Sequence, residues 1–494
     1  MKKTFLILFV ITIIASILRF YDLTKNPPGY YWDEVAIGYN AYSINQTGKD
    51  EWGAKFPLLF RSFNDYKAPL YIYAVAFSQK FLGPTDLSIR LPSAITGILS
   101  VPVLFFLTLE LLKSSKIALT TSFLLATSSW HLQFSRIGFE GALALLLVLC
   151  GLLFFLLAIR KNIYLLIPSL LFFALSIMAY HAEKIFTPLF LASLFFFFKK
   201  ALFEKPRKKL IIVILIGTIF FLPYLPTYFS SEGRVRLTQE SIFGQKEPAN
   251  ILFIKNYLSN FSLDYLFFRG DQNGRHSVKK LGELFGWQLP FVLVGLWVLV
   301  KNRNKSSAII FAWLLLAAIP VALVRPAPHA YRNFISVAAW EMVCAVGIWK
   351  LIKNYKTAFI IFVIAVYSFA VYLDHYYFHA KKAYAADWMD GNKEAVLYLK
   401  SVEKNYDRIL VYKDLPPIYI LFYGPYDPAK LHFSNHNLDH LGKYQYFHKF
   451  DLQRGQSKER TLVIVPSWAI SSSDNILREI RMNNGDPLYR IYEL

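Results

Sequence analysis

Long uncharged apolar runs, separated by short polar segments, recur along most of the chain. They lie near 4–20, 91–112, 117–133, 139–158, 163–180, 184–198, 210–229, 286–301, 306–324, 333–351 and 357–373. Most have roughly 15–20 residues, the length that crosses a hydrocarbon core ~30 Å thick. The pattern predicts an all-α polytopic membrane protein with eleven transmembrane helices.

The polar segments between the runs alternate in charge. One set is rich in Lys and Arg: 2–3, 113–116, 160–161, 199–209, 301–305 and 350–356. By the positive-inside rule these face the cytoplasm. We therefore expect a multi-pass protein of the cell membrane with a cytoplasmic N-terminus. Its outer loops are 21–90 and 230–285, and its C-terminal domain is extracytoplasmic.

Two apolar segments need a separate interpretation. The run 4–18 lacks a small-x-small cleavage site, so we interpret it as a retained first span rather than a signal peptide. Counting 70–82 as a span would invert every later loop. We therefore predict an interfacial or re-entrant helix there, on the outer face.

The tail changes character after about residue 374. Strand-like runs at 408–412 and 461–465 alternate with helical patterns at 391–404 and 473–482. We predict a transmembrane catalytic domain at 1–374 and a small soluble α/β domain at 375–494.

The formal charge of +21 would fit a nucleic-acid partner, but its placement argues against one. The basic residues cluster between apolar runs, where they set topology. The two cysteines, Cys150 and Cys344, both lie inside apolar runs, which argues against a disulfide framework or a cysteine metal site. No phosphate-binding glycine motif is present, and the interpretation requires no metal ligands, no cofactor and no divalent cation.

Candidate chemistry lies in the outer loops. Asp33 and Glu34 follow three aromatic residues, and a carboxylate there would act as a general base on a hydroxyl acceptor or cap a following helix. Lys67 and Arg90 begin apolar segments at the level of the lipid headgroups. They would neutralise a phosphate leaving group or simply extend to the interface.

Three short outer connections add further polar groups. Their candidate residues are Arg136 and Glu140, then Tyr180, His181 and Glu183, then His329 and Arg332. A single His or Arg at a helix end is usually structural. Five such loops on one face are typical of a shared cavity with acidic and phosphate-binding groups.

These motifs, in this order, resemble the GT-C superfamily, specifically the protein O-mannosyltransferase and aminoarabinose (lipid A) transferase group. The matching segments over about 1–375 are 32–34, 66–70, 90–94, 135–140, 180–181 and 328–332. The resemblance implies a GT-C fold with outer-face juxtamembrane helices. It implies that Asp33 is the base, that Lys67 contacts the donor phosphate, and that Glu140 holds the acceptor or orients water. Many relatives have an acid directly before the lysine, whereas this chain has Tyr66.

The implied function is an inverting transfer of a hexose or pentose from a polyprenyl-phosphate donor. The acceptor would be a hydroxyl of a protein, a glycolipid or a cell-wall polymer. We assign Lys67 and Arg332 to the phosphate. Sugar or acceptor would be bound by Glu34, Glu140 and His181. A transporter or flippase of lipid-linked glycans is the alternative, but it needs a polar path that the nearly charge-free spans do not supply. A membrane-anchored glycan sensor is a third.

Overall fold

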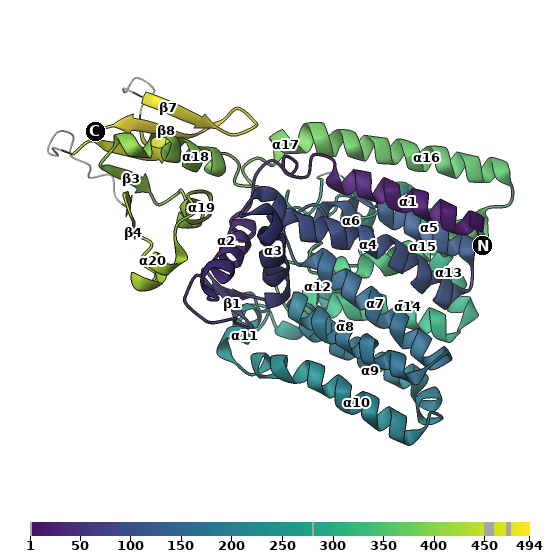
Figure 1. The fold of residues 1–494 in the computed structure, drawn as a ribbon. Coiled ribbons are helices and arrows are strands. Elements are labelled where there is room, and N and C mark those ends of the chain that lie inside the picture. Colours follow the sequence, from purple (N-terminus) through teal and green to yellow (C-terminus); the bar gives the residue numbers. More distant parts are fainter. Residues whose placement is uncertain (1, 279–280, 449–458, 471–475) are drawn as a thin grey trace. The chain divides into compact units, whose positions relative to one another are not determined.

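The computed structural model describes residues 2–278, 281–448, 459–470 and 476–494. They form two compact units, each built from separate parts of the chain (Figure 1). The membrane unit contains Met1–Tyr21, Leu58–Tyr71 and Leu91–His375. The sheet unit contains Asp22–Pro57, Ile72–Arg90 and Tyr376–Leu494. Much of the first predicted outer loop is thus grouped in one unit with the C-terminal sheet.

Among the described residues, eight helical segments are long and apolar enough to cross a membrane. They are α1 (Lys2–Phe20), α4 (Asp86–Leu112), α7 (Gly141–Arg160), α9 (Glu183–Phe203), α10 (Arg207–Phe221) with the 3-10 segment η2 (Leu222–Tyr228), α14 (Lys305–Ala322), η5 (Phe334–Ser336) with α15 (Val337–Leu351), and α16 (Tyr355–Asp374) with η6 (His375–His379) and α17 (Ala380–Ala383). The predicted class, a helical polytopic membrane protein, is confirmed.

The three other predicted spans are helical but shorter. They correspond to α5 (Ser115–Thr127) with α6 (Ser129–Phe134), to η1 (Ile163–Leu165) with α8 (Leu166–Ala179), and to α13 (Leu289–Asn302), which follows η4 (Gly286–Gln288). The run 117–133 is interrupted because the Ser128 side chain accepts a hydrogen bond from the His131 amide and starts a new helix. With 13 residues, α5 is about 20 Å long, less than the hydrocarbon thickness.

Helices α13 and α15 of the membrane unit pack against each other through glycines. A Cβ atom on Gly295 would lie 2.0 Å from the Val343 carbonyl oxygen, and one on Gly347 would lie 1.8 Å from that of Phe291. Because only glycine permits this approach, the two backbones pack directly, as small residues allow in membrane helix pairs. The unit is completed by β1 (Phe60–Ser62), β2 (Asp65–Lys67), α11 (Ser231–Gln239), α12 (Ala249–Ser259) and the π-helical η3 (Asp264–Phe268).

The sheet unit is a mixed six-stranded sheet with short helices. Its helices are α2 (Trp32–Thr47), most of α3 (Pro69–Leu82), α18 (Asn392–Val402), η7 (Glu403–Asn405), α19 (Pro417–Tyr423), α20 (Pro428–Phe433) and η8 (Ser467–Ala469). The strands are β3 (Arg408–Tyr412), β4 (His440–Leu441), β5 (Tyr444–Phe447), β6 (Thr461–Pro466), β7 (Ile476–Arg481) and β8 (Pro487–Glu493), in the order β4-β5-β3-β6-β8-β7. β3 runs parallel to β5 and β6, so the predicted α/β character is confirmed.

One predicted element of the tail is wrong. The helical pattern at 473–482 is a strand from Ile476 to Arg481, and 473–475 lie outside the described residues. β7 pairs antiparallel with β8, which adds backbone hydrogen bonds that local helical periodicity does not register. The predicted strands at 408–412 and 461–465 and the helix near 391–404 are confirmed.

Candidate active site

The two adjacent carboxylates at the start of α2 have different environments. The residue that caps this helix is Tyr31, so the interpretation of Asp33 as the N-cap is wrong. Glu34 is fully buried, and its Oε2 accepts a hydrogen bond from the Tyr31 amide at 3.3 Å. Asp33 lies in the first turn and stays partly exposed. Of the pair, Asp33 is therefore the residue that keeps part of its surface exposed.

Arg90 holds this part of the sheet unit together. It is fully buried and forms an ion pair with Glu34, with Nε 2.9 Å from Oε1 and Nη2 3.1 Å from Oε2. Its remaining N–H groups donate to the carbonyl oxygens of Leu23, Pro27 and Gly29 at 3.1, 3.1 and 2.5 Å. All five guanidinium donors are thus used within the unit. This arrangement does not support the predicted contact of Arg90 with a phosphate, nor that of Glu34 with sugar.

In the membrane unit, the loop before α9 meets the strand that carries Lys67. The Nε2 atom of His181 lies 2.6 Å from the carbonyl oxygen of Tyr66, the residue before Lys67 in β2. The Lys67 side chain is buried at the end of this strand. The His181–Tyr66 hydrogen bond therefore fixes the position of the lysine backbone relative to the loop 180–183.

His181 also lines a cavity of about 60 Å³ in the membrane unit. Its lining residues are Tyr180, His181, Ala182, Lys184, Ile185, Gly233, Glu240, Pro320, Val324 and Arg332. The structure thus brings together three predicted site residues, Tyr180, His181 and Arg332, from two separate loops. Glu183 does not line this cavity: it is fully buried and accepts a hydrogen bond from the Thr187 hydroxyl at 3.2 Å.

Two cationic side chains, Arg332 and Lys184, lie in the wall of the cavity. Arg332 forms an ion pair through Nη2 with Glu240, whose side chain is 42% exposed, and donates from Nη1 to the Arg325 carbonyl oxygen at 3.0 Å. Lys184 donates from Nζ to the Gly233 carbonyl oxygen at 3.2 Å. Positive charge at a cavity wall, beside an exchangeable carboxylate, is suited to an anionic ligand.

Glu140 is engaged by a tyrosine. The Tyr331 hydroxyl donates to Glu140 Oε2 at 2.8 Å and accepts from the Gly141 amide at 3.0 Å. Burial and the negative charge of Glu140 raise the pKa of Tyr331 well above its ordinary value, so the phenol remains a donor. The Tyr331 ring lies 4.8 Å from that of Tyr180, which connects this pair to a residue of the cavity wall.

Arg136 contacts the end of the first helix. Its Nη1 donates to the carbonyl oxygens of Leu18 and Arg19 at 2.6 and 3.1 Å. The last carbonyls of a helix lack partners within that helix, and a cation there satisfies them. These contacts give Arg136 a structural position at the end of α1.

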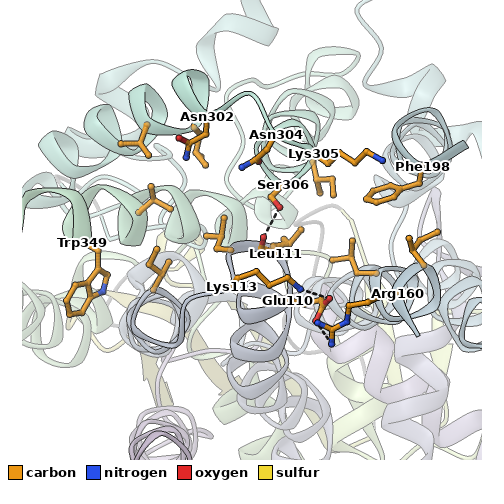
Figure 2. Close-up of a pocket in the computed structure, with 18 of the residues that line it drawn as sticks. Glu110, Leu111, Lys113, Arg160, Phe198, Asn302, Asn304, Lys305, Ser306 and Trp349 are labelled. Atoms are coloured by element: carbon orange, nitrogen blue, oxygen red, sulfur yellow. Dashed lines mark hydrogen bonds and ion pairs between the residues drawn. The ribbon is translucent and has the colours of Figure 1, made fainter. Parts of the chain in front are cut away.

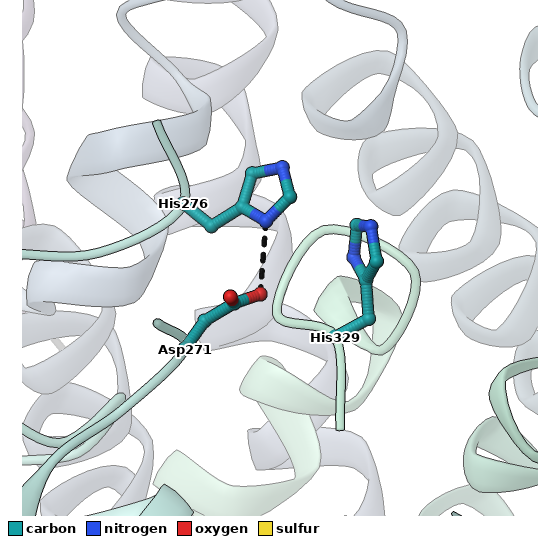
Figure 3. Close-up of side chains that lie close together, drawn as sticks. All are labelled: Asp271, His276 and His329. Carbon is teal, nitrogen blue, oxygen red and sulfur yellow. Dashed lines mark hydrogen bonds and ion pairs between the residues drawn. The ribbon is translucent and has the colours of Figure 1, made fainter. Parts of the chain in front are cut away.

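His329 belongs to a second polar cluster in the membrane unit, with Asp271 and His276 (Figure 3). The Nδ1 atom of His276 lies 2.9 Å from Asp271 Oδ2. Burial lowers the pKa of His276, against the opposing effect of Asp271. Burial alone would raise the pKa of Asp271, but the hydrogen bond and charge of His276 bring it below its ordinary value. The cluster therefore favours an ionised carboxylate beside neutral imidazole.

Four residues of these two groups were not among the predicted site residues: Lys184, Glu240, Asp271 and His276. Three of them lie in the loop 230–285, where no spacing motif marks them. Their positions become apparent only because the loop folds back onto the segments 180–184 and 325–332.

A larger cavity of about 710 Å³ opens elsewhere in the membrane unit (Figure 2). It lies among the ends of helices that carry the predicted cytoplasmic clusters, with Lys113, Arg160, Lys305 and Lys350 in its lining. Glu110 pairs with Lys113 at 2.7 Å and with Arg160 at 3.1 Å. None of the predicted site residues lines this cavity.

Comparison with known proteins shows which solved structures have a similar fold. The family model described as dolichyl-phosphate-mannose-protein mannosyltransferase matches residues 66–226. ArnT from Cupriavidus metallidurans in the apo state superposes with a TM-score of 0.61 at 10% identity, covering 98% of this chain and 97% of that chain. ArnT bound to undecaprenyl phosphate gives 0.59 at 11% identity, with coverages of 99% and 97%. The chain has the fold of ArnT.

A second solved structure is also similar. The archaeal oligosaccharyltransferase AglB from Archaeoglobus fulgidus, in complex with an inhibitory peptide and a dolichol-phosphate, matches with a TM-score of 0.55 at 14% identity. The match covers 91% of this chain but 61% of AglB, so the chain spans about three fifths of that protein. Among curated proteins, no sequence matches significantly. These matches confirm the predicted fold.

Proposed function

We propose that this protein is a membrane glycosyltransferase that takes a hexose or pentose from a polyprenyl-phosphate donor and transfers it to a hydroxyl acceptor at the outer face of the membrane. The observation that carries the proposal is the cavity of the membrane unit, where Arg332 meets His181 and Lys184 from a separate segment. The GT-C fold and the matched family model support the same reaction class.

The phosphate of the donor would bind at the cationic side of this cavity. Arg332 lies in its wall, and its partner Glu240 is partly exposed, so a phosphate can replace that carboxylate. Lys67 follows Tyr66, whose carbonyl is fixed by His181, and we assign it the second positive charge. Preorganised cations of this kind stabilise the charge that develops on a leaving phosphate.

We assign the general base to Asp33. The acceptor hydroxyl transfers its proton to this carboxylate while its oxygen attacks the anomeric carbon. The bond between that carbon and the phosphate oxygen breaks, and the lipid phosphate leaves with the electron pair. The configuration inverts in this single displacement. Asp33 suits the role because it is partly exposed, whereas the neighbouring Glu34 is occupied by Arg90.

The test is to incubate the purified full-length protein in liposomes with a panel of polyprenyl-phosphate sugars and hydroxyl acceptors. We expect one donor to release free lipid phosphate together with a glycosylated product. Movement of intact donor between leaflets without bond breakage would refute the transferase and support a flippase.

The base assignment is tested separately with Asp33→Asn. We expect product formation to fall by 10²-fold or more, the usual contribution of a general base, with the protein still folded. The matched control is Asp439→Asn, an exposed acid of the same unit, which should keep full activity. Wild-type activity in the Asp33 variant would contradict the assignment.

A further inference from the structure

Two loops of the membrane unit bring three potential metal ligands together. Asp271 and His276 come from the loop after η3, and His329 comes from the loop after α14 (Figure 3). All three side chains are buried, with 7–9% of their surface exposed. One ligand atom from each lies within 4.8 Å of the others.

The spacing is close to that of a metal site. In a tetrahedral zinc centre with bonds of about 2.0–2.2 Å, neighbouring ligand atoms lie roughly 3.4 Å apart. Asp271 Oδ2 and His276 Nδ1 are 2.9 Å apart, and the rings of His276 and His329 have centroids 4.4 Å apart. Side-chain shifts on the order of 1 Å would place all three ligand atoms around one ion.

The carboxylate is also held in place by its surroundings. Asp271 Oδ2 accepts a hydrogen bond from the Ala330 amide at 2.8 Å, and Oδ1 accepts one from the Asn273 amide at 2.9 Å. The Asp271 amide in turn donates to Glu283 Oε1 at 2.8 Å. Outer contacts of this kind orient the first ligands of metal sites. The positive charges of Arg275 and Arg332 act against a cation here, and the ionised carboxylate of Asp271 acts in its favour.

We propose that Asp271, His276 and His329 bind one zinc ion, with a water molecule in the fourth position. Two imidazoles and one carboxylate form a ligand set that suits zinc. The ion would join the loop 269–285 to the loop 325–332, the latter ending at Arg332. This proposal does not depend on sugar transfer, and its test does not use it.

The full-length protein is incubated with Zn²⁺, desalted, and its metal content is measured by mass spectrometry. We expect about one zinc per chain for the wild type, and less than a fifth of that for His276→Gln and for His329→Gln. The matched control is His375→Gln, a half-exposed histidine of the same unit, which should keep the wild-type content. Equal zinc in wild type and in the two ligand variants would overturn the proposal.

A second measurement covers the case in which the ligand variants fail to fold. X-ray absorption at the zinc edge of the loaded wild-type protein should show two imidazole nitrogens and oxygen ligands at about 2.0–2.2 Å. Fewer than two imidazoles, or a wild-type protein that retains no zinc after desalting, would overturn the proposal.

Discussion

The ion pair between Glu34 and Arg90 is the contact on which the first turn of α2 most clearly depends. Both side chains are fully buried, and Arg90 also ties down three carbonyls of the segment 23–29. Glu34→Gln keeps the size and shape of the side chain but removes its charge. In the variant, the amide oxygen of the new glutamine can accept only one of the two hydrogen bonds that Arg90 donates to the carboxylate. The guanidinium then stays buried without a negative partner.

The expected cost follows from that geometry. Removing one partner of a buried ion pair typically destabilises a protein by about 3–5 kcal/mol. Because three backbone carbonyls continue to satisfy Arg90, we expect the lower end, about 3 kcal/mol. For a unit of this size each kcal/mol corresponds to roughly 2–4 °C, so the melting temperature should fall by about 6–12 °C.

The assay is thermal unfolding of the purified full-length protein in detergent, followed by intrinsic fluorescence. The control is Glu394→Gln, which breaks a half-exposed pair with Arg478 in the same unit. Exposed pairs contribute about 0–1 kcal/mol, so the control should shift the melting temperature by less than about 4 °C. The reasoning is refuted if Glu34→Gln unfolds within the range of that control.

Three further substitutions test other parts of the structure. Lys67→Ala should raise the donor KM by about 10–100-fold, the equivalent of one charge-assisted hydrogen bond, and an unchanged KM would count against the phosphate contact. Tyr331→Phe removes the hydrogen bond to Glu140 and should cost about 1–3 kcal/mol, measured by thermal unfolding; an unaltered melting temperature would show that this bond is not important. Gly29→Ala places a Cβ atom 2.2 Å from the Trp388 carbonyl oxygen and should cost about 1–3 kcal/mol, so a variant as stable as wild type would disprove this close packing.

The membrane helices were predictable from sequence because a membrane-spanning segment must be apolar over its whole length. Every predicted run coincides with helix, including those that are too short to count as full spans. The predictions were wrong where a single residue ends a helix, or where pairing with a distant segment determines whether a segment is helix or strand. Ser128 breaks one run by capping a new helix, and the pairing of β7 with β8 overrides the helical pattern around Ile476.

The candidate site was predictable only in part. The aromatic and polar motifs identified Asp33, His181 and Arg332, because polar groups at the ends of apolar runs are easily recognised. They did not show that Arg90 pairs with Glu34, since these residues are 56 positions apart and each was interpreted locally. Nor did they indicate Glu240, which becomes relevant only when its loop reaches Arg332.

The contrast between the two arginines explains which of them can serve the donor. Arg90 has no exposed surface, and its five N–H groups all donate inside the sheet unit, so a phosphate would have to break a network whose loss costs several kcal/mol. Arg332 lines a cavity and pairs with a carboxylate that is 42% exposed. The Arg332 side chain itself is 13% exposed, so its accessible side is the one that faces the cavity and Glu240. The same residue type therefore closes a buried network at one position and lines a cavity at the other, which is why we propose Arg332 and not Arg90 for the donor phosphate.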